Sequence, residues 1–281
     1  MAQTINTNIM SLTAQRNLSR SQGRMATAME RLSSGLRVNS AKDDAAGLAI
    51  AERMNTQVRG MNVAMRNAND GISLSQVAEG GLNEIGDMLQ RMRELAVQSA
   101  NGTNGVGDRR NLDQEFKALA SEISRIAENT TFNGRAVVGT GAGEFQYQIG
   151  ANPGQTLNIT TVDITTGSGI ASLLTASLAG TSAGDGASLA NTAMEMLDTA
   201  IDTVTAQRSS YGAAQSRFES AINNLQIGME NQAAARGRII DADFAVETAA
   251  MVRAQILQQA GTAMVTQANS APQNVLALLG N

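Results

Sequence analysis

Three consecutive charged residues, Lys42, Asp43 and Asp44, form the cluster of this sequence that is best suited to chemistry. Paired carboxylates can act as a general acid and base, or they can bind a metal ion. These carboxylates, however, stand beside a glycine-containing break at the start of a predicted helix, where an aspartate side chain accepts hydrogen bonds from free backbone N–H groups. We therefore expect Asp43 or Asp44 to cap a helix rather than to catalyse a reaction.

The residue types that the chain lacks exclude several kinds of catalytic and metal-binding site. The chain contains no Cys and no His, and its lysines are Lys42 and Lys117 alone. This composition excludes disulfides, thiol nucleophiles and thiolate metal sites, and it removes the usual general base and the commonest metal ligand. The sequence therefore predicts no catalytic residue, no cofactor and no metal site, which makes an enzyme a weak alternative.

Composition indicates long helices. Hydrophobic residues make up 42% of the 281 residues, but aromatic residues make up only 2%, and 14 residues are Met. Small and flexible apolar side chains suit narrow seams between long helices. The N-terminus lacks the basic and apolar runs of a secretory signal peptide, and no apolar stretch approaches the length of a membrane span. We expect a mainly α protein built as a long antiparallel helical bundle or coiled coil.

Apolar residues recur with helical periodicity in several long segments. A break is expected at Arg236-Gly237-Arg238, and Pro272 is expected to end the last helix. In the second segment one seam position repeats every seven residues, and the alternate position is predicted to slip by one residue after Ile72. The predicted helices cover about 5–36, 45–100, 109–129, 189–236 and 243–268. The residues expected in the core of the central helices are Met54, Met61, Met65, Ile72, Leu82, Leu89, Phe116, Leu197, Val204, Tyr211, Phe218 and Leu225.

The middle of the chain changes character. Apolar and polar residues alternate on either side of Asn152-Pro153-Gly154, a pattern typical of a β-hairpin, within a region of β structure that we place at 131–165. Residues 165–188 are rich in Gly, Ser, Thr and Ala, and they are predicted to be a short, exposed and variable connector. Because helices flank this region on both sides, we expect the N- and C-terminal segments to pair.

Several strings in the two ends of the chain resemble those of bacterial flagellins, in the order in which the family has them. They span residues 1–135 and 189–281. The strings are Ile5–Asn8, Leu32–Arg37, Ala41–Gly47, Asn67–Ser73, Gln90–Ser99, Phe132–Gly134, Arg238–Phe244, Gln259–Gly261, Gln267–Asn269 and Pro272–Leu276.

The resemblance implies a structural subunit of the bacterial flagellar filament, extracellular and exported without a cleaved signal peptide. It implies an inner terminal coiled-coil domain with connecting spokes at 1–44 and 239–281, an outer helical domain at 45–238, and no large outer domains. In the family the terminal helices are disordered in the free subunit and fold on polymerisation. The seam expected to drive this assembly comprises Ile5, Ile9, Leu12, Leu18, Met25, Met29, Leu32, Phe244, Met251, Ile256 and Met264.

The resemblance also implies partners. They are copies of the same chain, an export chaperone, a filament cap protein, a hook–filament junction protein and a host Toll-like receptor. Arg91, Leu95 and Glu115 match the family positions that contact this receptor and neighbouring subunits. The C-terminal segment that contains Val275, Leu276, Leu278 and Leu279 matches the part bound by the chaperone or by a cytosolic immune sensor.

Two other structural roles stay open at this point. A hook–filament junction adaptor shares the terminal plan but would not polymerise into long tubes alone. A cytoplasmic coiled-coil scaffold would be found only inside cells. Nucleic-acid binding through Arg16, Arg20 and Arg24, which share one helix face, is disfavoured because the chain is acidic, with a net charge of −4, and nearly lacks aromatic residues. Membrane insertion is not expected.

Overall fold

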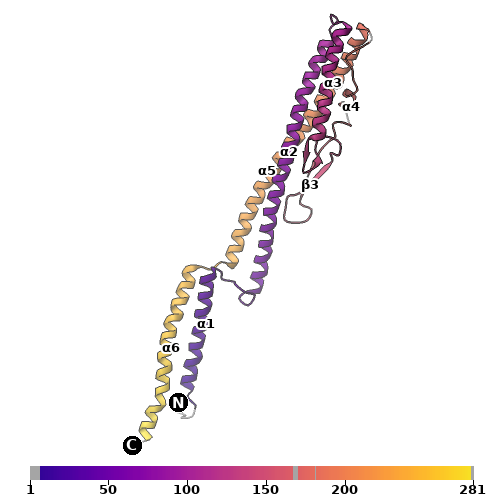
Figure 1. The fold of residues 1–281 in the computed structure, drawn as a ribbon. Helices are drawn as coiled ribbons and strands as arrows, with labels where there is room; N and C mark the ends of the chain where they lie inside the picture. The colour runs from indigo at the N-terminus through magenta and orange to yellow at the C-terminus, as the bar shows by residue number, and fades with distance from the viewer. Residues whose placement is uncertain (1–6, 167–169, 181, 280–281) are drawn as a thin grey trace. The chain divides into compact units, whose positions relative to one another are not determined.

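The computed structural model describes residues 7–166, 170–180 and 182–279, with the backbone alone described at 183–184 and 271–279. The chain is mainly helical, as predicted, and it carries two small pairs of strands (Figure 1). The helices are α1 (Ile9–Ser34), α2 (Ala45–Ala100), α3 (Val106–Asn129), α4 (Ile170–Leu173), α5 (Ala183–Ile240) and α6 (Phe244–Leu279). The strands are β1 (Thr131–Phe132), β2 (Arg135–Ala136), β3 (Glu144–Gln148) and β4 (Thr156–Thr160).

The chain folds as two compact units, which we name the terminal unit and the central unit. The terminal unit comprises Met1–Thr56 and Glu230–Asn281, and the central unit comprises Gln57–Met229. Both ends of the chain thus belong to one unit. The boundaries fall inside α2 and α5, whereas the division expected from the sequence lay at 44/45 and 238/239. Met54, expected in the central core, consequently belongs to the terminal unit.

The central unit has a continuous heptad seam along α2. Ala64, Ala68, Gly71, Ser75, Ala78, Leu82, Ile85, Leu89, Met92, Ala96 and Ser99 are all buried, and they follow one another at alternating steps of four and three residues. This is the spacing of packed helices. The predicted slip in register is wrong, because Ala64 and Gly71 occupy the alternate seam position and the larger Met65 and Ile72 lie half-buried beside it.

Most of the residues predicted in the central core are buried. Seven of the twelve residues are buried in one hydrophobic cluster that includes residues of α2, α3 and α5. The buried residues are Leu82, Leu89, Phe116, Leu197, Val204, Tyr211 and Phe218. The half-buried residues are Met54, Met61, Met65, Ile72 and Leu225.

The predicted β-hairpin is present in the central unit. Strands β3 and β4 are antiparallel, with Phe145 opposite Ile159 and Tyr147 opposite Leu157. Tyr147 packs edge-on against Phe218 of α5, with ring centroids 5.5 Å apart, so the hairpin is held on the helices by aromatic contact. The smaller pair of β1 and β2 turns through Asn133 and Gly134, both with positive φ, which suits an Asn-Gly hairpin turn.

Three predictions about breaks in the chain are wrong. The segment expected as an exposed connector contains α4 and buries Ile170, Leu173 and Leu178 in the central core. Helix α5 begins at Ala183 and continues through Gly237 to Ile240, and α6 continues through Pro272 to Leu279. A low content of large residues indicated a loop at 165–188, but three well-spaced apolar side chains are enough to bury that segment against a helical core.

Candidate assembly surface

Small residues form the contact between α1 and α6 in the terminal unit, where the two helices lie side by side (Figure 1). The buried residues of this pair are Ser11, Ser21, Ala28, Glu247, Ala254 and Ala268. The Ser21 hydroxyl donates a hydrogen bond to the Ala254 carbonyl at 3.1 Å, and the Ser11 hydroxyl donates to Asn269 Oδ1 at 2.6 Å. Short side chains allow the helices to approach closely, but they bury little apolar area.

Capping residues define where both terminal helices begin. Asn8 Oδ1 accepts a hydrogen bond from the Ser11 N–H group at 3.0 Å at the start of α1. Asp243 Oδ1 accepts from the N–H groups of Ala245 and Val246 at the start of α6. Gly35 ends α1 with a φ of 71°, a left-handed conformation that glycine adopts without steric cost.

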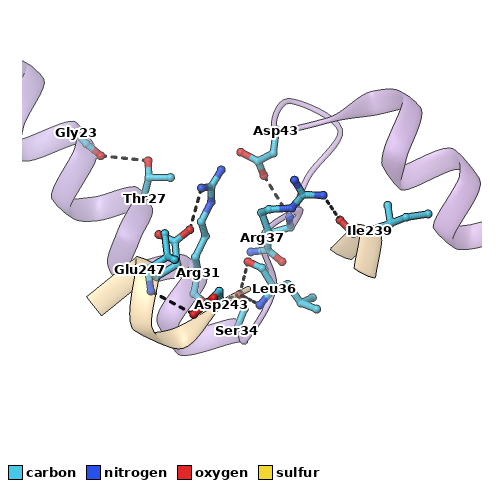
Figure 2. Close-up of polar contacts among 12 residues, drawn as sticks. Gly23, Thr27, Arg31, Ser34, Leu36, Arg37, Asp43, Ile239, Asp243 and Glu247 are labelled. Carbon is cyan, nitrogen blue, oxygen red and sulfur yellow. Dashed lines mark hydrogen bonds and ion pairs between the residues drawn. The ribbon is translucent and has the colours of Figure 1, made fainter. Parts of the chain in front are cut away.

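Polar contacts join the C-terminal end of α1 to the N-terminal end of α6 (Figure 2). Arg31 of α1 points towards Glu247 of α6, and their side chains form an ion pair at 3.1 Å. Arg37 donates to the Ile239 carbonyl at 2.6 Å, and the Ala242 N–H group donates to the Gly35 carbonyl at 2.9 Å. A short backbone pairing of residues 35–38 with 239–242 therefore fixes the connections beside a small core of Val38, Ala51 and Ile240.

Many large apolar side chains of the terminal unit are exposed, and few are fully buried. Val38 and Ile240 are its only large hydrophobic residues in the buried class, within the part of the chain that the structure describes. Among the side chains that the structure describes on α1 and α6, ten large apolar residues are exposed, and we call them the terminal apolar surface. They are Ile9, Met10, Leu12, Met29, Phe244, Val246, Val252, Ile256, Leu257 and Met264.

Two hollows follow this surface. A groove of about 660 Å³ runs between α1 and α6, and Ile9, Met10 and Met264 line it together with Arg20 and Arg24. A shallower depression of about 510 Å³ is lined by α6 residues that include Val252 and Ile256. Concave apolar surfaces of this kind suit the side chains of another helix.

The predicted assembly seam divides into two groups. Leu18, Met25, Leu32 and Met251 are half-buried, which fits packing within the terminal unit. The remaining described members, Ile9, Leu12, Met29, Phe244, Ile256 and Met264, are exposed on the terminal apolar surface. Ile5 lies outside the described residues. Sequence periodicity identified apolar stripes, but it did not show that small residues rather than these large ones fill the α1–α6 contact.

The neighbouring carboxylates Asp43 and Asp44 both accept local hydrogen bonds just before α2, but only Asp44 caps that helix. Asp44 Oδ1 accepts from the Gly47 N–H group at 2.8 Å in the first turn of α2, which confirms the capping prediction. Asp43 Oδ2 accepts from the hydroxyl and the N–H group of Ser40, each at 3.0 Å, and these hydrogen bonds lower the pKa of Asp43. Among the described residues, no group of three or more acidic side chains could hold a metal ion.

The predicted receptor-contact residues are not all on the surface. Arg91 and Glu115 are exposed and joined by an ion pair at 2.8 Å, which links α2 to α3. The hydrogen bonds that Arg91 donates to Glu94 and Glu115 raise the pKa of Arg91. Leu95, by contrast, is only 1% exposed and belongs to the central core. Leu95 therefore does not share a surface with Arg91 and Glu115, because α2 packs against both α3 and α5 and its buried face is wider than one seam.

Sequence reasoning missed two buried charged residues of α3. Arg109 donates from its guanidinium to the carbonyls of Ser99 and Asn101, at 2.9 and 3.1 Å, and so satisfies the C-terminal end of α2. Asp113 accepts from Lys117 Nζ at 2.6 Å and from the Leu178 N–H group at 2.7 Å. Both lie in phase with the buried Phe116 and Ile123, so charged residues at seam positions were the signal available.

The remaining predicted positions lie in the two terminal helices, α1 and α6. Arg16, Arg20 and Arg24 are all exposed. The backbone of Val275, Leu276, Leu278 and Leu279 continues α6, but their side chains lie outside the described residues. No helix in the described part of the chain is long and apolar enough to cross a membrane.

Comparisons with known proteins agree along nearly the whole chain. The profile of the bacterial flagellin N-terminal helical region matches residues 5–139, and that of the C-terminal helical region matches residues 194–279. Flagellin of Halalkalibacterium halodurans is 45% identical, over 98% of this chain and 99% of the relative. Flagellin A of Vibrio anguillarum is 36% identical, over 99% and 100%.

The comparison with solved structures concerns the fold. A flagellar hook-associated protein from Vibrio parahaemolyticus superposes with a TM-score of 0.58, covering 71% of this chain and 100% of that chain, at 14% identity. At this identity the likeness concerns the fold alone, so the junction-adaptor alternative gains no further support.

Proposed function

The chain belongs to the bacterial flagellin family, and from this premise we propose that its terminal apolar surface is where one filament subunit packs against the next. Flagellins are structural subunits that assemble into the flagellar filament for motility, not enzymes. The observation that carries the proposal is the exposure of ten large apolar side chains on α1 and α6. Exposed apolar area of this extent marks an interaction site.

Free energy gives the reason for coupling folding to assembly. Ordering one residue costs about 1–2 kcal/mol of backbone entropy. The side chains that the α1–α6 contact buries fully are Ser, Ala and Glu247 of the ion pair, and its larger apolar residues are only half-buried, so the contact does little to offset that cost. Covering the exposed side chains with a neighbouring subunit stabilises the pair by about 1–2 kcal/mol for each residue. The terminal helices therefore become fully ordered only among copies of the same chain.

The growth mode follows from the type of contact. The terminal apolar surface lies on α1 and α6. In a head-to-tail array, this surface of one subunit contacts a different surface of the next subunit. Such heterologous contacts do not close on themselves, so addition continues as a tube or a filament.

Removal of residues 239–281 tests the proposal. The truncated chain keeps all of Gln57–Met229, so the central unit stays folded, while seeded polymerisation is lost. Both tyrosines, Tyr147 and Tyr211, lie in the central unit, and the chain has no Trp. Tyrosine fluorescence during urea unfolding therefore reports the central unit, and electron microscopy reports filaments. Normal tubes from the truncated chain would refute the role of the termini.

A matched pair of point variants refines this test. Ile256→Asn places an amide on the terminal apolar surface, whereas Gln255→Asn changes the neighbouring exposed polar residue of the same helix. We expect Ile256→Asn to raise the critical concentration for polymerisation about tenfold or more, and Gln255→Asn to leave it unchanged. Equal behaviour of the two variants contradicts the assignment of this surface.

Further partners rest on the family resemblance. These are an export chaperone at Val275–Leu279, a cap protein, a hook–filament junction protein and a host Toll-like receptor. Exposure of Arg91 and Glu115 supports the receptor proposal, and the burial of Leu95 restricts it to the two charged residues. Arg91→Ala is expected to weaken receptor signalling in a reporter-cell assay, with Arg125→Ala, an exposed arginine of α3, as the control.

Export without a cleaved leader is also a proposal. By the family resemblance, we expect that no N-terminal segment is removed during export. N-terminal sequencing of filaments sheared from cells tests this directly, since loss of such a segment would show that a leader is removed.

A further inference from the structure

Three methionine thioethers stand out on the terminal apolar surface. Met10 is 65% exposed, Met29 is 53% exposed and Met264 is 60% exposed. Among the methionines whose side chains the structure describes, these three alone are in the exposed class, while the others are half-buried or buried. Met10 and Met264 come from opposite ends of the chain and line the same groove between α1 and α6. The most accessible sulfur atoms therefore lie where subunits are proposed to meet.

We propose that Met10, Met29 and Met264 are oxidation sites at which peroxides switch off assembly of the free subunit. This inference rests on the proposed role of the terminal apolar surface. In the reaction a thioether sulfur attacks one oxygen of hydrogen peroxide, the O–O bond breaks, and a sulfoxide and water form. The sulfur is oxidised by two electrons and the peroxide is reduced by two, so no further reagent is needed.

Oxidation changes the property on which this surface depends. A thioether is apolar and polarizable, whereas a sulfoxide is polar, chiral and a strong hydrogen-bond acceptor. Burial of a sulfoxide against the aliphatic side chains of a neighbouring subunit leaves its oxygen without a donor, which is unfavourable. Since sulfoxides can be reduced enzymatically back to thioethers, the switch is reversible.

Assembly and oxidation should exclude one another. In a filament the same sulfur atoms are covered by neighbouring subunits, so they react slowly with peroxide. In a free subunit they are open to solvent. Met92, which is 0% exposed in the central core, serves as an internal reference that stays reduced in both states.

The experiment uses the full-length subunit treated with graded hydrogen peroxide and quenched with catalase. Peptide mass spectrometry measures the sulfoxide at each methionine, and sedimentation of seeded reactions measures the critical concentration. We expect sulfoxide at Met10, Met29 and Met264 before Met92, with a critical concentration raised about tenfold or more. Methionine sulfoxide reductase should restore assembly, and preformed filaments should be protected at the three sites.

Two triple variants locate the effect. Met→Leu substitution at 10, 29 and 264 conserves volume and apolarity, so assembly is retained and is expected to resist peroxide. The matched control carries Met→Leu at 88, 92 and 196 in the central unit, and it is expected to stay as sensitive as the unmodified protein. Equal sensitivity of both triple variants would overturn the proposal.

One further measurement does not depend on variants. In a partly oxidised sample, sulfoxide at the three sites should be enriched in the supernatant and depleted in the pelleted filaments. An equal distribution between the fractions shows that the sites do not control assembly. Failure of the untreated protein to polymerise at all is a different result, because it contradicts the proposed function itself rather than the oxidation switch.

Discussion

The two units treat large apolar side chains in opposite ways. The central unit buries Leu82, Ile85, Leu89 and Met92 completely along one face of α2. The terminal unit places small residues such as Ser21 at its internal contact and leaves ten large apolar residues of α1 and α6 exposed. The central unit is thus complete as a single chain, whereas the terminal unit has the composition of an interface. The same amphipathic helices can build a core or a polymer contact, depending on which face carries the short side chains.

The strongest contrast is between a core leucine and a surface isoleucine. Leu89→Ala removes a fully buried side chain and is expected to lower the free energy of unfolding of the central unit by about 2–5 kcal/mol. Ile256→Ala, at a residue 59% exposed, should leave that value within about 0.5 kcal/mol yet raise the critical concentration. Urea unfolding followed by tyrosine fluorescence and seeded sedimentation check the two results. If Ile256→Ala lowered the free energy of unfolding and Leu89→Ala did not, the assignment of Leu89 to the core and of Ile256 to the assembly surface would be contradicted.

Glycines of α2 provide the next test. A Cβ atom at Gly71 would lie 2.6 Å from the Phe218 ring, so Gly71→Ala is expected to destabilise the central unit by about 1–3 kcal/mol through overpacking. A Cβ atom at Gly80 would meet nothing beyond its own stretch of helix within 4 Å, so Gly80→Ala should stabilise the helix by up to about 1 kcal/mol. Thermal unfolding measured by circular dichroism distinguishes them. Equal shifts for both variants would show that the Gly71–Phe218 contact is loose.

Asp113 links the stability of the central unit to pH. Burial alone would raise the pKa of Asp113, but hydrogen bonds from Lys117, the Leu178 N–H group and Ser177 outweigh it and lower the pKa below its ordinary value. A lowered carboxyl pKa contributes stability above the pKa of the unfolded chain, about 3.9, and this contribution is lost as pH falls through the folded value. Asp113→Asn should therefore cost about 1–3 kcal/mol at pH 7 and progressively less below pH 4.

The control for this prediction is Glu122→Gln. Glu122 pairs with Arg125 on the exposed side of α3, where solvent and salt screen the charges. We expect urea midpoints of this variant to follow those of the unmodified protein from pH 7 to pH 3. A difference for Asp113→Asn that is constant with pH would show that its ionisation is not the source of the stability.

Sequence reasoning could predict the helices, the hairpin and most of the central core, because large apolar residues recur there with regular spacing. Ala64 and Gly71 were missed since small residues give no periodic signal, although close helix contact requires them. The outward orientation of Ile256 could not be predicted, because an apolar stripe looks the same whether it meets its own chain or a copy. Leu95 was misplaced for a related reason, as periodicity does not show how many helices pack around α2.

The smallest expected effect concerns charges on the surface of the central unit. Arg93 of α2 and Asp198 of α5 form an ion pair at 2.6 Å, but both side chains are about half exposed, so water and salt screen the attraction. A double-mutant cycle of Arg93→Ala and Asp198→Ala is expected to give a coupling energy within experimental error, measured by urea unfolding at physiological ionic strength. A coupling comparable to the loss in Leu89→Ala would mean that surface charge, and not the heptad core, holds α2 to α5. The central unit would then be stabilised by surface electrostatics, and burial of apolar side chains would no longer distinguish it from the terminal unit.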